Sequence, residues 1–169
     1  MTISEILNEH IDPFEIEDEK LCSLFSFFLH LAPTIDSSSS RFVPQKSLID
    51  AWNQFVISLN INNTDYYFYR TEYITDTRLA KYGLTSNDSV TKSKKGFTCC
   101  FKDADNNYEI NCFLRHIRNS IAHSNVYVLI RGRKYLLFDD YNRKGHRTAR
   151  ILISQTDLKC LRRQIEKKR

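Results

Sequence analysis

Hydrophobic side chains recur every three or four residues along several stretches of the chain, the spacing of one buried helical face. The pattern is strongest within residues 111–125, NCFLRHIRNSIAHSN, and predicts a helix there. Its core-facing positions are Ile110, Phe113, Leu114, Ile117 and Ile121. Its opposite side carries Arg115, His116, Asn119, Ala122 and His123. The helix therefore has a packing face and a separate face with groups that can move protons and bind phosphate.

Similar periodicity, with capping residues and prolines at the boundaries, predicts further helices. A first long helix begins after Asp12 and Pro13 and ends at Pro33, and Ser47 caps a second helix. The expected helical segments are a short turn at residues 3–8, residues 14–32, residues 48–60, and residues 156–169, with Ser154 or Thr156 as the last cap. We expect loops at the serine-rich residues 36–40 and at residues 60–63.

Residues 65–82 fit two readings, because their run of aromatic side chains suits a strand and their length suits a helix. We favour a helix that ends at Gly83. Residues 85–96 are polar and predict a loop. Residues 97–101 form a short apolar patch, and residues 103–107 precede the helix described first.

After residue 125 the pattern changes to short runs rich in β-branched and aromatic residues: VYVLI, YLLFDDY and RTARILISQ. Gly132 and Gly145 lie between these runs, where turns are needed, so we expect a small antiparallel ribbon. The overall prediction is a mainly α protein, a helical bundle with a small antiparallel β-ribbon and a C-terminal helix. We expect one domain over residues 1–169, helical to about residue 124 and β-ribbon plus helix over residues 125–169.

Composition narrows the class of protein. The formal net charge is +5 and the pI is near 8.9, which permits a polyanionic partner. No apolar run reaches the ~18 residues that span a bilayer, and the acidic N-terminus does not resemble a signal peptide. We therefore expect a cytoplasmic protein with no membrane partner. The five cysteines lack zinc-ligand spacing, so we expect idle thiols and no metal site or cofactor.

Residues 118–123 read RNSIAH: an arginine, a polar residue directly after it, and a histidine five positions from the arginine. This R-x4-H arrangement, late in an amphipathic helix, resembles the HEPN superfamily, whose R-x4–6-H motif marks ribonucleases of toxin–antitoxin systems, phage defence and CRISPR effectors. The specific resemblance covers residues 108–128. It implies a HEPN-like bundle with Arg118, Asn119 and His123 as catalytic residues.

The resemblance further implies RNA cleavage without metal, in which the ribose 2′-hydroxyl attacks the adjacent phosphorus. His123 is expected to act as general base or acid, because imidazole titrates near neutral pH. Arg118 is expected to hold the scissile phosphate and to offset charge in the transition state. Asn119 is expected to orient the histidine or the phosphate.

Helical geometry adds a constraint on this motif. Arg118 and His123 are five positions apart, so they diverge by about 140° around an ideal helix. Two copies packed across a two-fold axis would bring both residues of both chains around one cleft, and small Ala122 would allow close approach. We therefore expect a homodimer with a composite site.

Other polar residues have two readings each. The expected RNA-binding residues are Arg115, His116, Lys94, Lys95, Arg131 and Arg133. Arg115 would equally pair with an acidic neighbour. His116 would support the site from behind or, as we favour, be a solvated side chain. The aromatic run at residues 66–69 suits base stacking or, more simply, the core. Asp139 and Asp140 lack a third carboxylate for a metal and predict a turn.

The HEPN resemblance implies an endoribonuclease that acts on RNA in a toxin–antitoxin or antiviral defence role, with an antitoxin or regulatory protein as a partner. A first alternative is a non-catalytic HEPN module that uses the same face to bind RNA or protein. A second is an antitoxin-like interaction protein whose basic surface recognises an acidic partner.

Overall fold

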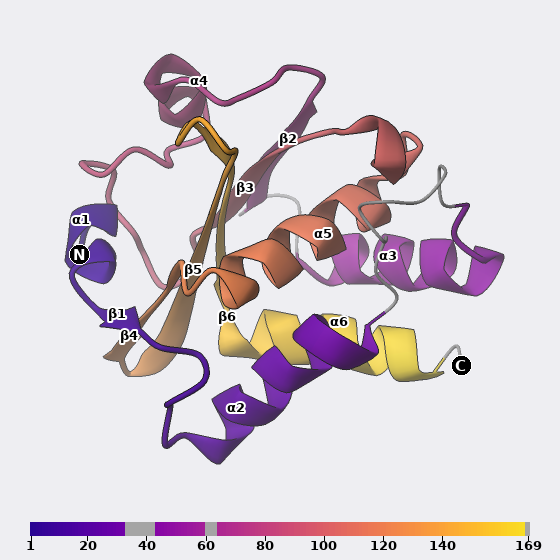
Figure 1. The fold of residues 1–169 in the computed structure, drawn as a ribbon. Coiled ribbons are helices and arrows are strands. Elements are labelled where there is room, and N and C mark those ends of the chain that lie inside the picture. Colours follow the sequence, from indigo (N-terminus) through magenta and orange to yellow (C-terminus); the bar gives the residue numbers. More distant parts are fainter. Residues whose placement is uncertain (33–42, 60–63, 168–169) are drawn as a thin grey trace.

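The computed structural model describes residues 1–32, 43–59 and 64–167, and these residues form a mixed sheet of six strands in the order β1-β4-β5-β6-β3-β2 (Figure 1). The strands are His10–Ile11 (β1), Thr64–Tyr69 (β2), Lys95–Cys100 (β3), Val126–Arg131 (β4), Arg133–Tyr141 (β5) and Arg147–Ser154 (β6). Strands β2 and β3 are parallel, and the other neighbouring pairs are antiparallel. The sheet thus joins the N-terminal and C-terminal parts of the chain.

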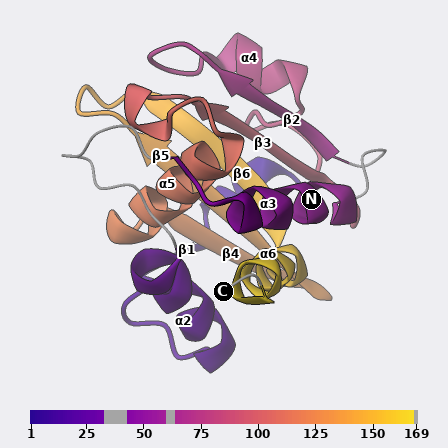
Figure 2. The ribbon, with the colours of Figure 1, turned by 90° about the vertical axis from the view of Figure 1, so that its right-hand side faces the viewer.

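Helices cover both faces of this sheet. The longer ones lie together on one face (Figure 2). They are α2 (Glu19–Ser26), which continues into the π-helical turn η1 (Phe27–Leu31), α3 (Lys46–Ser58), α5 (Glu109–Ala122) and α6 (Gln155–Lys167). Two short helices, α1 (Ile3–Leu7) and α4 (Asp76–Lys81), pack on the other face. A short 3-10 turn, η3 (Asp103–Asp105), precedes α5.

Strand β5 divides the core into two layers through its two-residue period. Leu136 and Phe138 join the cluster beneath the longer helices, whereas Tyr135 and Leu137 join the cluster beneath α1 and α4. The strand is therefore buried on both faces, which is why its sequence reads as a nearly continuous apolar run.

Helix α5 is held against the sheet by aromatic contacts. The Phe113 ring lies 5.1 Å from the rings of both Trp52 on α3 and Phe97 on β3, measured between centroids. The indole Nε1 of Trp52 donates to Glu109 at the start of α5, at 3.1 Å. These contacts fix the helix over the sheet and so determine where its C-terminal end lies.

The expected helical bundle with a small ribbon is wrong, because the described chain contains a mixed sheet with helices on both faces. Strands β1, β2 and β3 all lie within the part that was expected to be helical. The preference for a helix over residues 65–82 is wrong in its first half, where β2 pairs with β3 along its whole length. Only the segment Asp76–Lys81 is helical. Backbone pairing with a distant strand decided this segment, and local pattern does not record such pairing.

Other expectations are confirmed. The three strands predicted after residue 125 are present and antiparallel, with Gly132 and Gly145 at positive φ in their turns, but they belong to the six-stranded sheet and are not a separate small ribbon. The last helix is capped by Ser154, whose Oγ accepts from the backbone N–H of Asp157 at 3.2 Å. The first long helix begins later than expected, at Glu19 with Asp18 as its cap. The loops expected at residues 36–40 and 60–63 lie outside the described residues.

The turn expected at Asp139 and Asp140 is also wrong, because both residues belong to β5 and are buried. Asp139 faces the layer of α1 and α4, where its carboxylate accepts two hydrogen bonds from Arg150 on β6, from Nε at 2.8 Å and Nη2 at 2.7 Å. Arg150 Nη1 also donates to the carbonyl of Leu84 at 3.0 Å. Both charged side chains are almost fully buried. Asp139 is the only ion-pair partner of Arg150 among the described residues, whereas Asp139 also lies 3.5 Å from Arg147 Nε.

We predict that Asp139→Ala lowers the free energy of unfolding by about 3–5 kcal/mol, because it leaves the buried Arg150 guanidinium without a counter-charge. Urea denaturation measures the loss. Glu72→Ala is the matched control: it removes an exposed pair with Lys144 and is expected to cost about 0–1 kcal/mol. Equal losses in the two variants would contradict this account of the buried pair.

Candidate active site

Helix α5 ends at a turn that places His123 at the surface. His123 is the C-cap residue, and its backbone N–H donates to the carbonyl of Asn119 at 2.9 Å. Ser124 then adopts a left-handed conformation with φ of 55°, and the N–H of Asn125 donates to the carbonyl of Ser120 at 2.8 Å. The chain enters β4 immediately afterwards, so the imidazole of His123 is exposed beside the edge of the sheet.

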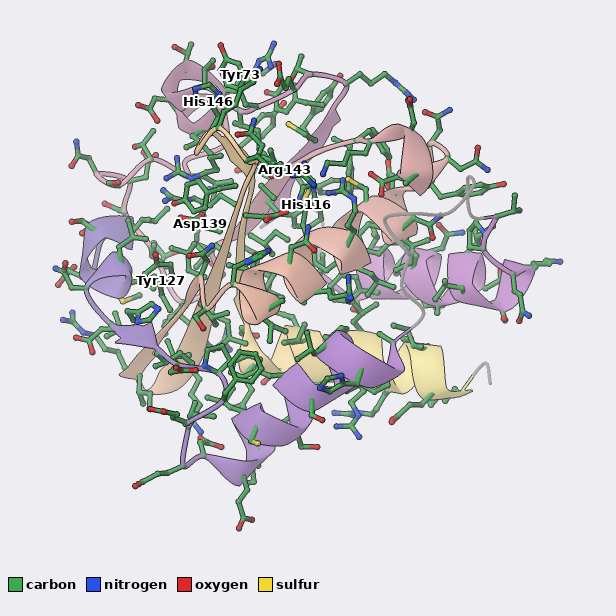
Figure 3. All side chains as sticks on the ribbon, viewed as in Figure 1. Tyr73, His116, Tyr127, Asp139, Arg143 and His146 are labelled. Atoms are coloured by element: carbon green, nitrogen blue, oxygen red, sulfur yellow. The ribbon has the colours of Figure 1, made fainter. Side chains whose placement is uncertain are left out.

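His123 and Asn119 line a cleft of about 640 Å³. Its other walls come from the ends of β2, β3 and β5 and from the turn between β5 and β6. The remaining lining residues are Thr71, Glu72, Cys100, Phe101, Lys102, Asp140, Tyr141, Asn142, Arg143, Lys144 and Thr148. Figure 3 labels Arg143, which lies on this turn, and His116, which lies on α5. The cleft thus combines an exposed imidazole, a side-chain amide and several cations.

Asp140 is a buried residue at the base of the cleft, next to Asn119. Because it follows Asp139 on β5, its side chain points to the opposite face of the sheet, toward α5. Its Oδ2 atom lies 2.7 Å from His116 Nδ1 and accepts from Asn119 Nδ2 at 3.2 Å. Its Oδ1 atom accepts from the backbone N–H of Tyr141 at 3.0 Å. Asp140 therefore links the buried and cleft-facing residues of α5.

Arg115 and His116 lie behind Asp140. Arg115 forms a bidentate ion pair with Asp105, in which Nε and Nη2 each donate at 2.7 Å. Nη2 also donates to the carbonyl of Cys100 at 2.9 Å. His116 Nε2 is 2.9 Å from that carbonyl and 3.2 Å from Arg115 Nη2. His116 is 0% exposed and Arg115 is 8% exposed, so neither presents a surface to RNA in this structure. The solvated reading of His116 is wrong, and the acidic-neighbour reading of Arg115 is the one observed.

The network shifts the pKa values of its members in opposite directions. Burial lowers the pKa of His116, as does the charge of Arg115, but its contacts with Cys112 and Asp140 outweigh both, so the pKa is raised above 6.5. Burial raises the pKa of Asp140, but the hydrogen bonds from His116 and Asn119 and the nearby positive charges outweigh it, so the pKa is lowered below 3.8. Both shifts favour a protonated His116 beside an ionised Asp140.

Arg118 lies apart from this cleft. It is half-buried, does not line the cleft, and forms no hydrogen bond or ion pair with any described residue. The cleft-facing residues Asn119 and His123 lie on another side of α5, because His123 is about 140° from Arg118 around the helix. One chain therefore does not bring the two outer residues of the motif together.

The other residues expected to bind RNA are not near the cleft either. Lys94 and Lys95 lie where β3 begins, and Arg131 and Arg133 flank the turn between β4 and β5. The cleft lies at the opposite ends of β3 and β5, about 20 Å away by the rise of a strand. All four are engaged elsewhere: Lys94 with the carbonyl of Tyr82, Lys95 with Asp157, Arg131 with Glu5, and Arg133 with the carbonyl of Lys92.

Sequence reasoning missed Asp140 and Lys102 as site residues, whereas Arg143 and Lys144 belong to the basic C-terminal residues from which RNA contact was inferred. One signal was available for Asp140: in a strand reading of YLLFDDY, consecutive carboxylates must point to opposite faces. Lys102 carried no signal of its own. The three cations come together only at the end of the sheet where β3 and β5, which are separated by β6, both end. Among the described residues, no group of three or more His, Cys, Asp or Glu side chains is arranged to hold a metal ion.

Comparison with known proteins identifies the family of this chain. The family described as HEPN pEK499 p136 matches residues 42–168, which is most of the chain. The chain therefore belongs to this HEPN family, and the HEPN membership predicted from the R-x4-H motif is confirmed. The comparisons with curated proteins and with solved structures returned no match. Within the described part of the chain, no helix is both long and apolar enough to cross a membrane.

The His116–Asp140 pair predicts a pH window for stability. The raised pKa of His116 contributes stability that is present below pH 6.5 and lost as pH rises through the folded-state pKa. The lowered pKa of Asp140 contributes stability that is present above pH 3.8 and lost as pH falls through the folded-state pKa. Asp140→Asn should therefore cost most between these two values, measured as the free energy of unfolding against pH. A loss of the same size at every pH would rule out this linkage.

Proposed function

We propose that this protein is an endoribonuclease that cleaves RNA without a metal ion, in the cleft at the C-terminal end of α5. HEPN domains are often ribonucleases or toxins, and they commonly dimerise and bind RNA. One observation carries the proposal for this chain: the motif residues Asn119 and His123 line a cleft together with the cations Lys102, Arg143 and Lys144. An imidazole among cations suits proton transfer next to a phosphate.

The reaction follows from the groups available. The ribose 2′-oxygen forms a bond with the adjacent phosphorus, and the bond from phosphorus to the 5′-oxygen of the next nucleotide breaks. A base takes the proton of the 2′-hydroxyl, and an acid supplies a proton to the departing 5′-oxygen. The products are a 2′,3′-cyclic phosphate and a free 5′-hydroxyl. His123 serves as one of these two proton-transfer groups, because its imidazole is exposed in the cleft.

Arg118 enters this mechanism from a second copy of the chain. Its guanidinium has no hydrogen-bonding or ionic partner among the described residues, and exposed Ala122 lies beside it on the outer side of α5. Two copies that meet along this side would bring the Arg118 of each toward the His123 of the other. An arginine delivered in this way would bind the scissile phosphate through two N–H groups and offset its developing charge.

The wall opposite His123 would hold the neighbouring phosphates. Lys102, Arg143 and Lys144 are exposed, and Lys144 is engaged only by the exposed Glu72, at 3.1 Å, among the described residues. Such cations are available to a polyanion, whereas a buried ion pair would first have to be broken. Arg115 and His116 would support the site from behind, and the distant Lys94, Lys95, Arg131 and Arg133 would contact only a longer RNA.

We place this activity in a toxin–antitoxin or antiviral defence role, in the cytoplasm, with an antitoxin or other regulatory protein as a partner that restrains it. The second candidate function is a non-catalytic HEPN module that binds RNA or protein on the same face. The separation of Arg118 from His123 within one chain favours that alternative if no dimer forms.

We predict that His123→Ala abolishes cleavage of single-stranded RNA in the presence of EDTA, by at least about 100-fold, the usual contribution of a general acid or base. His30→Ala is the matched control, because His30 is also an exposed histidine near a helix end but lies outside the cleft. Thermal melting would show that both variants fold. Cleavage that persists in His123→Ala would remove the catalytic role and leave the binding module.

Mixing two inactive variants tests the composite site. Arg118→Ala and His123→Ala are each expected to be inactive alone. In a mixed dimer, one site would combine the intact Arg118 of one chain with the intact His123 of the other, so mixing should restore RNA cleavage. If each chain held a complete site of its own, the mixture would stay as inactive as its components.

A further inference from the structure

The side-chain amide of Asn119 has only one orientation that satisfies its surroundings. The Asp140 carboxylate is an acceptor, so the NH₂ end of the amide must face it, and Nδ2 donates to Asp140 Oδ2 at 3.2 Å. The carbonyl oxygen Oδ1 is then the end that has no hydrogen-bond donor among the described residues. Because Asn119 lines the cleft, this oxygen is an acceptor available to a bound ligand.

Buried groups hold Asp140 in place and therefore maintain this orientation. Asp140 is 3% exposed, and its second oxygen accepts from the backbone N–H of Tyr141. His116 contacts it at 2.7 Å from a fully buried position. His116 donates from Nδ1 in either of its protonation states, since its Nε2 can donate to the carbonyl of Cys100 or accept from Arg115 Nη2. A change in the charge of His116 thus leaves the acceptor role of Asp140 intact.

We propose that Asp140 and His116 are positioning residues that fix Asn119 Oδ1 as the acceptor for a ribose 2′-hydroxyl in the cleft. This inference rests on the proposed function, because it names the substrate group that the cleft reads. A 2′-hydroxyl is a donor that RNA has and DNA lacks, so an acceptor held at this point favours ribose over deoxyribose. Without Asp140, the amide would be free to turn its NH₂ end toward the cleft, and the preference would disappear.

The substitution Asp140→Asn tests the positioning with little change of shape. Its side chain replaces one carboxylate oxygen by an NH₂ group. The backbone N–H of Tyr141 is a fixed donor, so the remaining oxygen is expected to face it. The NH₂ group then faces His116 and Asn119, whose amide can turn its oxygen toward this new donor. Asn119→Ala removes the acceptor itself from a half-buried surface position and is not expected to disturb folding.

Binding measures the preference independently of cleavage. We would compare the dissociation constants of a short oligouridine and its 2′-deoxy counterpart in a His123→Ala background, where RNA stays intact. The His123→Ala protein, which is the parent in this comparison, should bind oligouridine about 3- to 10-fold more tightly than its 2′-deoxy counterpart, as expected for one hydrogen bond. Asn119→Ala and Asp140→Asn should each bring the ratio to about one, and the double variant should show no further change. Asp157→Asn is the control, because this buried carboxylate binds Lys95 and Ser154 outside the cleft.

The outcomes separate this inference from the ribonuclease itself. Ribose preference that depends on Asn119 and Asp140, in a protein that cleaves no RNA, would support the positioning and refute the catalytic function. A ratio unchanged in Asn119→Ala, or lost equally in Asp157→Asn, would overturn the inference even if the wild-type protein cleaves RNA. Equal affinity of the parent for both probes, or binding of neither, would overturn it as well.

Discussion

Two consecutive buried carboxylates on strand β5 are the constraint on which this structure depends. A strand sends neighbouring side chains to opposite faces, so Asp139 and Asp140 need partners in different layers. Removing such a charge from water is costly, and each carboxylate is compensated by charge and hydrogen bonds together. Asp139 has Arg150, and Asp140 has His116 and Asn119. The second set joins α5 to the sheet and places the end of the helix beside the C-terminal end of β5.

The basic residues at the two ends of the sheet differ in whether acidic residues or carbonyls engage them. At the end of the sheet where β3 begins, lysines and arginines are engaged by Asp157, Glu5 and backbone carbonyls. At the opposite end, the side chains of Lys102 and Arg143 form no ion pair with any described residue. An excess of positive charge thus develops beside His123 and not along the whole ribbon. In the function proposed above, this local charge attracts the phosphate backbone of RNA more than the net charge of the chain does.

The HEPN motif here lies on a helix that packs against a sheet, and a strand of that sheet accepts a hydrogen bond from Asn119 of the motif. Helix geometry alone would leave Asn119 as one more polar residue on α5. Asp140, on a strand, determines which end of its amide faces the cleft. Arg118 receives no such support from its own chain, and its position on the outer side of α5 is consistent with a role across an interface between two copies. Asn119 is thus positioned within its own chain, whereas the function proposed above takes Arg118 from a second copy.

Local patterns were sufficient for part of this architecture. The core face of α5, the three antiparallel strands with glycines in their turns, and the family motif all depend on residues within a few positions of one another. The mixed sheet was not predictable in this way, because β2 pairs with β3 and β1 with β4 across long separations, and short apolar runs do not reveal their partners.

In the candidate site too, some features follow from local sequence and others only from the fold. The sequence by itself determined that Arg118, Asn119 and His123 share one helix and that Arg118 diverges from His123, because both follow from helical spacing. Only the tertiary structure decided that Arg115 and His116 are buried, since η3, β3 and β5 cover a side of α5 that a single helix would leave in water. It also decided which cations meet His123, because the ends of distant strands come together only when the sheet forms.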